Sequence, residues 1–154
     1  MTAVIPSKAR RRHRDDLQRR RSRSGADWEA VLCEELDALP HAWARRWPKA
    51  WAGQPFDISA EIDGHAFAIE CKSIARGNLP FSALRPSEVE NLSRFEDAGG
   101  IAVIAVRRHE PPMQVFVPWY TVRPRILAGD RGSIPLAGQP RTLADVLEVS
   151  LPWS

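Results

Sequence analysis

The chain has 154 residues, of which 44% are hydrophobic and 27% are charged, and its formal net charge at pH 7 is +3. This length predicts one domain whose core can fold without disulfide staples. No apolar run approaches the roughly 18 residues that a membrane-spanning helix needs, which argues against an integral membrane protein. The charged start lacks an apolar stretch after it, and Cys33 and Cys71 are isolated, so we expect reduced thiols and a cytoplasmic protein.

Basic residues are concentrated at the start of the chain. Residues 1–24 carry nine basic side chains and two acidic ones, a net charge of +7, so residues 25–154 carry −4. A block of like charge predicts a disordered segment that contacts nucleic-acid phosphates, although it could instead serve only solubility or localisation. We therefore expect a disordered basic arm over residues 1–23 and one folded domain over residues 24–154. The candidate nucleic-acid-binding residues are Arg10, Arg11, Arg12, Arg14, Arg19, Arg20 and Arg21.

The first helix is predicted from about residue 25 to residue 39. Ser24 is a plausible N-cap, and Pro40 ends the helix. Glu29 lies one position off the apolar stripe, at the edge of the buried face, where it could also be an ordinary solvated glutamate. The apolar stripe consists of Trp28, Val31, Leu32, Leu36 and Leu39.

Residues 41–51 contain three tryptophans and three cations, and their secondary structure is ambiguous. The spacing of Trp43 and Trp47 suits a helix, but an edge strand ended by Pro48 fits equally well. The rings of Trp43, Trp47 and Trp51 could stack on nucleic-acid bases or could simply close the core.

Residues 55–72 predict a β-hairpin around the dipeptide Asp63-Gly64. This dipeptide favours a two-residue type I′ turn, because both turn positions need a positive φ. The register that follows places Asp57 opposite Glu70, where two carboxylates repel each other. Alternation puts Asp57, Glu70 and Lys72 on one face and gives the other face a core surface, which consists of Phe56, Ile58, Ala60, Ile62, Phe67, Ile69 and Cys71.

The second half of the chain alternates between helix and strand patterns. Pro86 begins a helix over about residues 87–97, which Gly99-Gly100 ends. Residues 101–106 predict a central strand buried on both faces, and residues 114–117 predict the next strand. Residues 119–128 are expected to be helical or irregular, and Thr142 caps a short helix over residues 143–148. The order predicts an α/β fold with a small mixed sheet.

The opposed carboxylates at Asp57 and Glu70 suggest metal chemistry. Carboxylate oxygens are the ligands that Mg²⁺ prefers, and a bound metal activates water and polarises a phosphoryl oxygen. Lys72 could orient the nucleophile or neutralise charge that develops on phosphorus. A second metal would need a further carboxylate, for which Glu29 is the natural candidate and Glu88 another. Alternatively, the hairpin is a surface element with a harmless Glu–Lys pair.

These residues resemble the PD-(D/E)xK nuclease superfamily, and more closely the RecU-type Holliday-junction resolvases, over roughly residues 25–120. The resemblance rests on Pro55-Phe56-Asp57, Glu70-Cys71-Lys72-Ser73, the basic arm, Leu79-Pro80-Phe81 and Gly99-Gly100-Ile101-Ala102. It implies a restriction-endonuclease-like αβββαβ core with a mixed sheet flanked by helices. It also implies catalytic roles for Asp57, Glu70 and Lys72 and a metal site that includes Glu29, Asp57 and Glu70. Where the family often has a His-Gln pair, this chain has Ser87-Glu88.

The resemblance implies an endonuclease that needs Mg²⁺ or Mn²⁺ and leaves 5′-phosphates. The expected substrate is a four-way DNA junction, cut by a homodimer whose two sites are related by a two-fold axis. Two alternatives remain open at this stage. One is a less structure-selective repair or phage nuclease of the same fold, and the other is a non-catalytic nucleic-acid-binding protein that has kept the fold.

Overall fold

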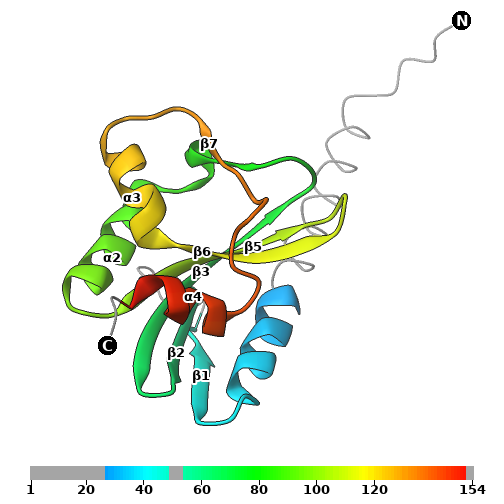
Figure 1. The fold of residues 1–154 in the computed structure, drawn as a ribbon, viewed down its shortest axis with the longest axis vertical. Helices are drawn as coiled ribbons and strands as arrows, with labels where there is room; N and C mark the ends of the chain where they lie inside the picture. The colour runs from blue at the N-terminus through cyan, green and yellow to red at the C-terminus, as the bar shows by residue number, and fades with distance from the viewer. Residues whose placement is uncertain (1–26, 49–53, 152–154) are drawn as a thin grey trace, which may run out of the picture.

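The structure is a computed structural model, and it describes residues 27–48 and 54–151 (Figure 1). The basic arm and Trp51 lie outside the described residues, so their predictions stay predictions. Residues 27–37 form the N-terminal helix. The elements that follow are β1 (Ala42–Arg46), β2 (Ile58–Ile62), β3 (His65–Ile74), β4 (Leu79–Pro80), η1 (Phe81–Ala83), α2 (Pro86–Asp97), β5 (Ile101–Arg108), β6 (Met113–Pro118), α3 (Trp119–Leu127), β7 (Ser133–Ile134) and α4 (Leu143–Ser150).

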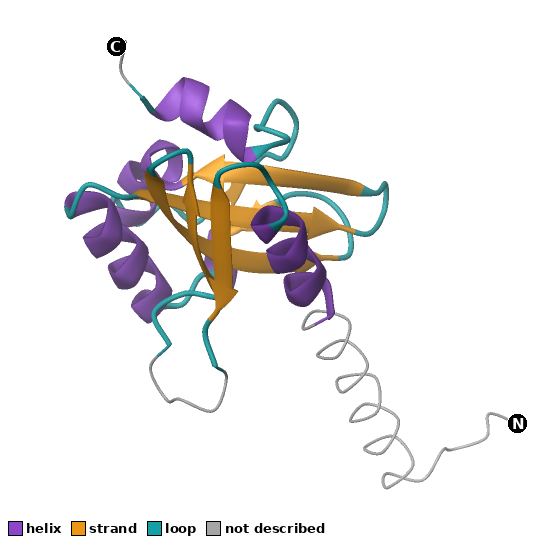
Figure 2. Ribbon diagram, turned by 90° about the horizontal axis from the view of Figure 1, so that it is seen from below, coloured by secondary structure: helices purple, strands orange, loops and turns teal. Residues whose placement is uncertain are grey.

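Five of the strands form one twisted sheet in the order β1-β2-β3-β5-β6 (Figure 2). The β3–β5 pair is parallel and the other three pairs are antiparallel, so the sheet is mixed. Helix α2 connects the two parallel strands, as a parallel connection requires. Counting only the strands of this sheet, the order from the N-terminal helix to β5 is αβββαβ, and the predicted fold class is confirmed.

The hairpin of β2 and β3 has the predicted turn and register. Asp63 and Gly64 both have positive φ, 51° and 78°, as a type I′ turn requires. Ile58 lies opposite Ile69, which is the register deduced from the sequence. A slip of one residue would have moved every side chain of the hairpin to the opposite face.

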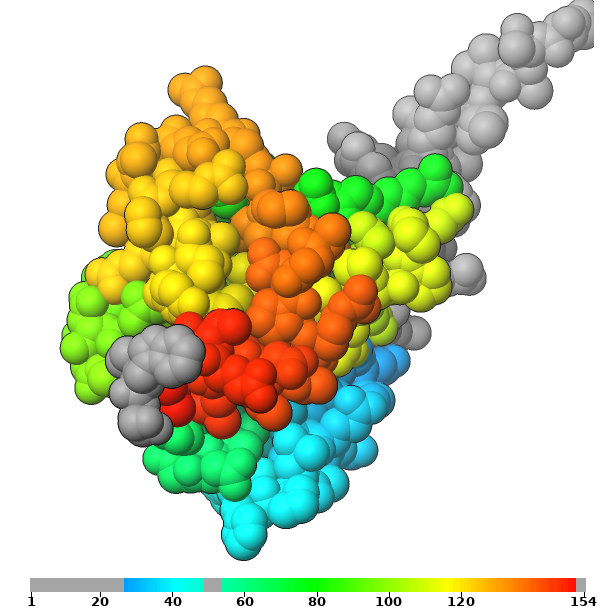
Figure 3. Space-filling view, viewed as in Figure 1, coloured from blue at the N-terminus to red at the C-terminus, as the bar shows by residue number. Residues whose placement is uncertain are grey.

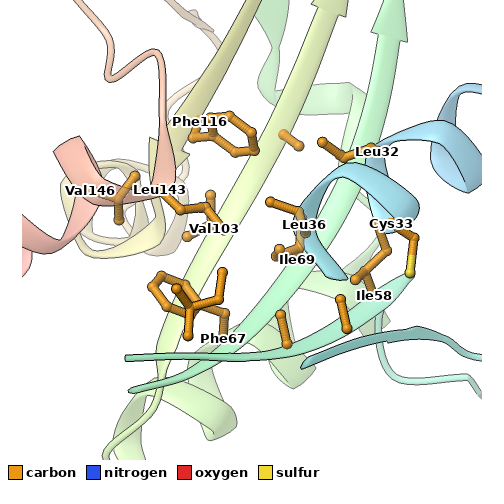
Figure 4. Packing of buried hydrophobic residues seen from close by; sticks show 14 of the residues in the cluster. Leu32, Cys33, Leu36, Ile58, Phe67, Ile69, Val103, Phe116, Leu143 and Val146 are labelled. Carbon is orange, nitrogen blue, oxygen red and sulfur yellow. The ribbon is translucent and has the colours of Figure 1, made fainter. Parts of the chain in front are cut away.

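The sheet separates two hydrophobic cores. The N-terminal helix and α4 both pack on one face of the sheet. Leu32 and Leu36 of the N-terminal helix and Val146 of α4 belong to the same core there (Figure 4). Helices α2 and α3 pack on the other face, which Leu92 and Trp119 help to fill. Both faces of the central strand β5 are therefore covered, as predicted.

Phe56 belongs to the second core, so its predicted place on the same face as Ile58 is wrong. The chain bends at Asp57, before β2 begins, and simple alternation does not extend through this bend. Phe56 packs edge-on against Phe95 of α2, with a ring-centroid distance of 5.4 Å.

The N-terminal helix buries a stripe that is shifted from the predicted one. Trp28, Leu32, Cys33 and Leu36 are buried, whereas Val31 is 50% exposed, and Leu39, just after the helix, is 43% exposed. The buried side is therefore turned away from Val31. As a result Glu29, on the neighbouring flank, has only 14% of its side chain exposed.

Residues 42–46 form the edge strand β1, which resolves the ambiguity between helix and strand. The outward N–H of Ala44 donates to Asp37 Oδ1 at 2.9 Å, and Arg45 Nη1 donates to the Ala44 carbonyl at 2.7 Å. Asp37 and Arg45 also form an ion pair at 3.3 Å, so these side chains cover the middle of the exposed edge and hinder strand addition.

The remaining elements largely follow the sequence. Pro86 opens α2, the Thr142 hydroxyl accepts from the Asp145 N–H at 3.1 Å, and residues 119–127 form a helix despite Pro124. The two-residue strands β4 and β7 pair with each other and were not predicted. In the described parts of the chain, no helix is both long enough and apolar enough to span a membrane.

Candidate active site

Asp57 is fixed at the point where the hairpin meets the edge strand. Its N–H donates to the Ile69 carbonyl, and its own carbonyl accepts from the Trp47 N–H, both at 3.1 Å. The backbone of Asp57 is therefore held between β1 and β3. Its Oδ2 accepts from the Cys71 N–H at 2.8 Å, and its Oδ1 accepts from Gln54 Nε2 at 2.8 Å. These bonds fix the side chain as well as the backbone.

Glu70, Lys72 and Glu88 lie next to Asp57 on the same side of the sheet. Lys72 Nζ lies 3.7 Å from Glu70 Oε1 and 2.8 Å from Glu88 Oε2, so the ammonium lies between two carboxylates. Glu88 is placed by the first turn of α2, where its Oε2 also accepts from the Arg85 N–H at 3.0 Å. The site thus combines β3, the residue just before β2 and the N-terminal end of α2.

Negative charge exceeds positive charge among these four side chains. Burial is the main cause that raises the pKa of Glu70 to about 9, and the charges of Asp57 and Glu88 raise it further, against the opposing effect of Lys72. Asp57 is 9% exposed and Glu70 is 6% exposed, so water screens their repulsion poorly. The sheet therefore holds a buried carboxyl pair in which Glu70 keeps a proton at neutral pH, and a bound cation would replace that proton.

The four side chains line an open pocket of about 520 Å³. Gln54, Arg85, Ser87 and Asn91 complete its polar wall. A pocket of this kind admits solvent and a polar substrate to the buried carboxylates.

Asp57 and Glu70 suit a hard divalent cation that keeps several water ligands, as Mg²⁺ commonly does. Within the described ranges, no group of three or more His, Cys, Asp or Glu side chains is arranged to hold a metal ion. The residues therefore fit a site with two carboxylate ligands completed by water, rather than a cage built entirely from protein.

Glu29 does not line the pocket. Its Oε2 lies 3.3 Å from Arg46 Nη2 of the edge strand. Burial is the main cause that raises the pKa of the Cys71 thiol, and the charges of Asp57 and Glu29 raise it further. Both carboxylates are therefore close enough to Cys71 to interact with it electrostatically. Glu29 is thus near the site but held by Arg46, whereas Glu88 reaches the pocket directly.

Sequence reasoning missed Gln54 and the role of the Cys71 backbone. Gln54 belongs to no recognisable motif. The only signal in the sequence was its position three residues before Asp57. Cys33 and Cys71 are both free thiols, as expected.

Trp43 of β1 and Trp47, just after β1, differ in their contacts. Trp43 is 48% exposed with Arg45 stacked 5.1 Å from its ring centroid. Trp47 is 38% exposed, its indole N–H donates to Ser59 Oγ at 2.8 Å, and its ring packs edge-on against Phe56 of the second core with a ring-centroid distance of 6.0 Å.

The similarity of this chain to known proteins lies among solved structures. No family model matches the sequence, and no curated protein matches it. Among solved structures, the chain is similar to Archaeoglobus fulgidus Hjc, a Holliday junction resolvase from an archaeal hyperthermophile. The two are 28% identical, and the match covers 62% of this chain and 78% of that chain with a TM-score of 0.49.

Proposed function

We propose that this protein is a metal-dependent DNA endonuclease of the PD-(D/E)xK superfamily. The observation that carries the proposal is the buried pair of Asp57 and Glu70 in an open pocket, with Lys72 beside it. A purely structural role does not account for a buried carboxyl pair in which burial and the neighbouring charges keep Glu70 protonated at neutral pH. A phosphodiester substrate that arrives with a divalent cation does.

Each side chain has a defined part in this proposal. Asp57 and Glu70 would hold Mg²⁺ or Mn²⁺, which when bound lowers the pKa of a water ligand and polarises a phosphoryl oxygen. Lys72 presents its ammonium to the pocket, where it can neutralise charge that develops on the phosphate. Glu88 holds that ammonium in place through two contacts, at 2.9 Å and 2.8 Å. We assign Glu88 a positioning role, and Glu29 the role of an additional carboxylate held by Arg46.

Four-way junctions are the substrate that we propose, cut by a homodimer that leaves 5′-phosphates. The RecU-like residues of the sequence support this choice. The similar Archaeoglobus protein is described as a Holliday junction resolvase, but the substrate proposal does not depend on that similarity. The competing substrates are forks, plain duplexes and single strands.

The test is cleavage of labelled four-way junction, fork, duplex and single-stranded DNA with Mg²⁺, with Mn²⁺ and with a chelator. Asp57→Ala and Lys72→Ala should lower the cleavage rate at least about 100-fold, the loss expected when a group that stabilises the transition state is removed. Binding of the junction in chelator should change little.

Two matched controls accompany these variants. Glu61→Ala removes an exposed carboxylate from β2, and Arg94→Ala removes an exposed cation from α2. Both should cut like the parent. If Asp57→Ala and Lys72→Ala also cut like the parent, the site assignment is wrong. If the parent cuts duplex and junction equally, the junction preference is wrong while the nuclease assignment stands.

A further inference from the structure

A second pocket, of about 560 Å³, lies at the far end of β5 and is distinctly basic. Its lining includes the side chains of Arg107, Arg108, His109 and Arg141. The other lining residues are Pro112, Met113 and Gln114, so none of the lining residues is acidic. Concave surfaces with several arginines are typical sites for phosphate, because the planar guanidinium matches phosphate oxygens in pairs.

Side chains of the N-terminal helix and of β3 hold Arg107 and His109 in place. Arg107 lies 5.1 Å from the ring centroid of Trp28, and its Nε donates to Ser73 Oγ at 3.3 Å. His109 Nε2 lies 3.3 Å from the same hydroxyl. The basic side chains are therefore oriented by the start of the N-terminal helix and by β3.

Arg108 and Arg141 keep positive charge that no ion pair among the described residues compensates. Arg108 donates to the Pro111 carbonyl at 2.9 Å and to the Gly77 carbonyl at 3.2 Å, and both acceptors are neutral. Arg141 is exposed. Among the ion pairs formed within residues 27–48 and 54–151, none involves Arg108 or Arg141.

The pocket lies close to the candidate active site in the fold but outside it. Ser73, which contacts Arg107 and His109, directly follows Lys72 on β3, and alternation along the strand points their side chains to opposite faces. Figure 3 shows the orange segment before α4 next to the yellow-green β5–β6 hairpin, on the face that also carries the N-terminal helix. The first residue that the structure describes, residue 27, directly precedes Trp28.

We propose that this pocket binds a phosphodiester of the DNA backbone as a second contact, separate from the phosphate that is cut. This second contact rests on the proposed nuclease function in one respect, because that function makes DNA the ligand. It adds a sequence-independent contact that positions the substrate, because phosphate contacts fix the register of a protein on DNA without reading the bases.

The test measures equilibrium binding of the full chain to labelled junction and duplex DNA, in chelator, over a series of salt concentrations. Arg141→Gln should weaken binding and lower the slope of log Kd against log salt by about 0.9, the value expected for the loss of one phosphate contact. Arg108→Gln/Arg141→Gln should lower the slope by about 1.8 on the same basis. Arg141→Lys should retain the parental slope, since the charge is kept.

Arg131→Gln is the matched control, because Arg131 is exposed in the loop before β7 and carries the same charge. If Arg141→Gln and the double variant keep the slope of Arg131→Gln, the proposal is wrong. Inorganic phosphate is titrated separately, with the His109 ring signals as the NMR readout. Saturation by micromolar phosphate together with an unchanged DNA slope would identify a small-anion site and also overturn the proposal.

Cleavage does not enter this measurement, so the two proposals fail in different ways. If the parent does not cut DNA but Arg141→Gln lowers the salt slope of binding, only the nuclease assignment is wrong. If the parent cuts DNA but Arg141→Gln leaves the salt slope unchanged, only the second phosphate site is wrong.

Discussion

Asp57 explains at the scale of one residue why the site is rigid before any ligand binds. Its backbone bonds to β1 and β3, and its carboxylate accepts from the Cys71 N–H, which would otherwise need a backbone partner. The carboxylate therefore continues the bonding of the hairpin before the first residue of β2, while it faces Glu70. The same bonds that complete the fold thus hold the acidic pair together.

The titration of Glu70 tests whether burial beside Asp57 keeps a proton on its carboxyl in metal-free protein. The ordinary pKa of its carboxyl is 4.5, and burial next to Asp57 raises it to about 9 in the folded protein. Between these values the folded state keeps a proton that the unfolded chain has released. The free energy of unfolding contributed by Glu70 should therefore fall as the pH rises through this window.

Urea denaturation in chelator across that pH range measures this effect. Glu70→Gln cannot titrate, so its free energy of unfolding should decline less with pH than that of the parent. Glu61→Gln, at an exposed position of β2, should follow the parent curve. Parallel curves for the parent and Glu70→Gln would contradict the raised pKa.

At the scale of elements, α2 connects the core to the site. It places Glu88 against Lys72 at its first turn and Phe95 against Phe56 in its last turns. Gly100, just beyond the helix, lies directly against the ring of Phe95. The position of Phe56, next to Asp57, therefore depends on the packing after α2.

Gly100→Ala should destabilise the protein by about 1–3 kcal/mol, the usual cost of an added methyl group in a packed site. A Cβ at this position would clash with Phe95. Phe95→Leu/Gly100→Ala should lose less stability than the two single changes together, with a coupling of about 0.5–3 kcal/mol. Thermal or urea unfolding of all four proteins gives this cycle, and strict additivity would refute the proposed clash.

The same elements show how far sequence reasoning reaches. The Asp63-Gly64 turn fixed the register of the hairpin, because few backbone conformations can join two strands in two residues. That register brought Asp57, Glu70 and Lys72 together correctly. Phe56 was misplaced because a bend precedes β2, and Val31 was misplaced because the buried side of the helix depends on the sheet it meets. Strands of two residues, such as β4 and β7, carry too few residues for a periodic signal.

At the scale of the whole molecule, charge is separated along the chain. Residues 1–24 carry +7, whereas the rest carries −4 and includes the acidic site. The basic pocket around Arg107 and Arg141 lies next to the start of the described chain. An anionic polymer would therefore be attracted by the arm and the basic pocket and would reach the acidic site only together with a cation.

Deletion of residues 1–23 should weaken DNA binding and flatten its salt dependence. The slope of log Kd against log salt should fall by about 0.9 for each phosphate that the arm contacts. The temperature of unfolding should stay the same if the domain begins at residue 24, as predicted. An unchanged slope would show that the arm is not an electrostatic contact, whatever the outcome for Arg141.

The central claim is that Asp57 and Glu70 form a divalent-metal site, and anomalous scattering from crystals soaked in Mn²⁺ tests it most directly. The claim predicts an anomalous peak within coordination distance of carboxylate oxygens of both residues, and the loss of that peak in Glu70→Gln. No peak at saturating Mn²⁺, or a peak that leaves either carboxylate without contact, would contradict it.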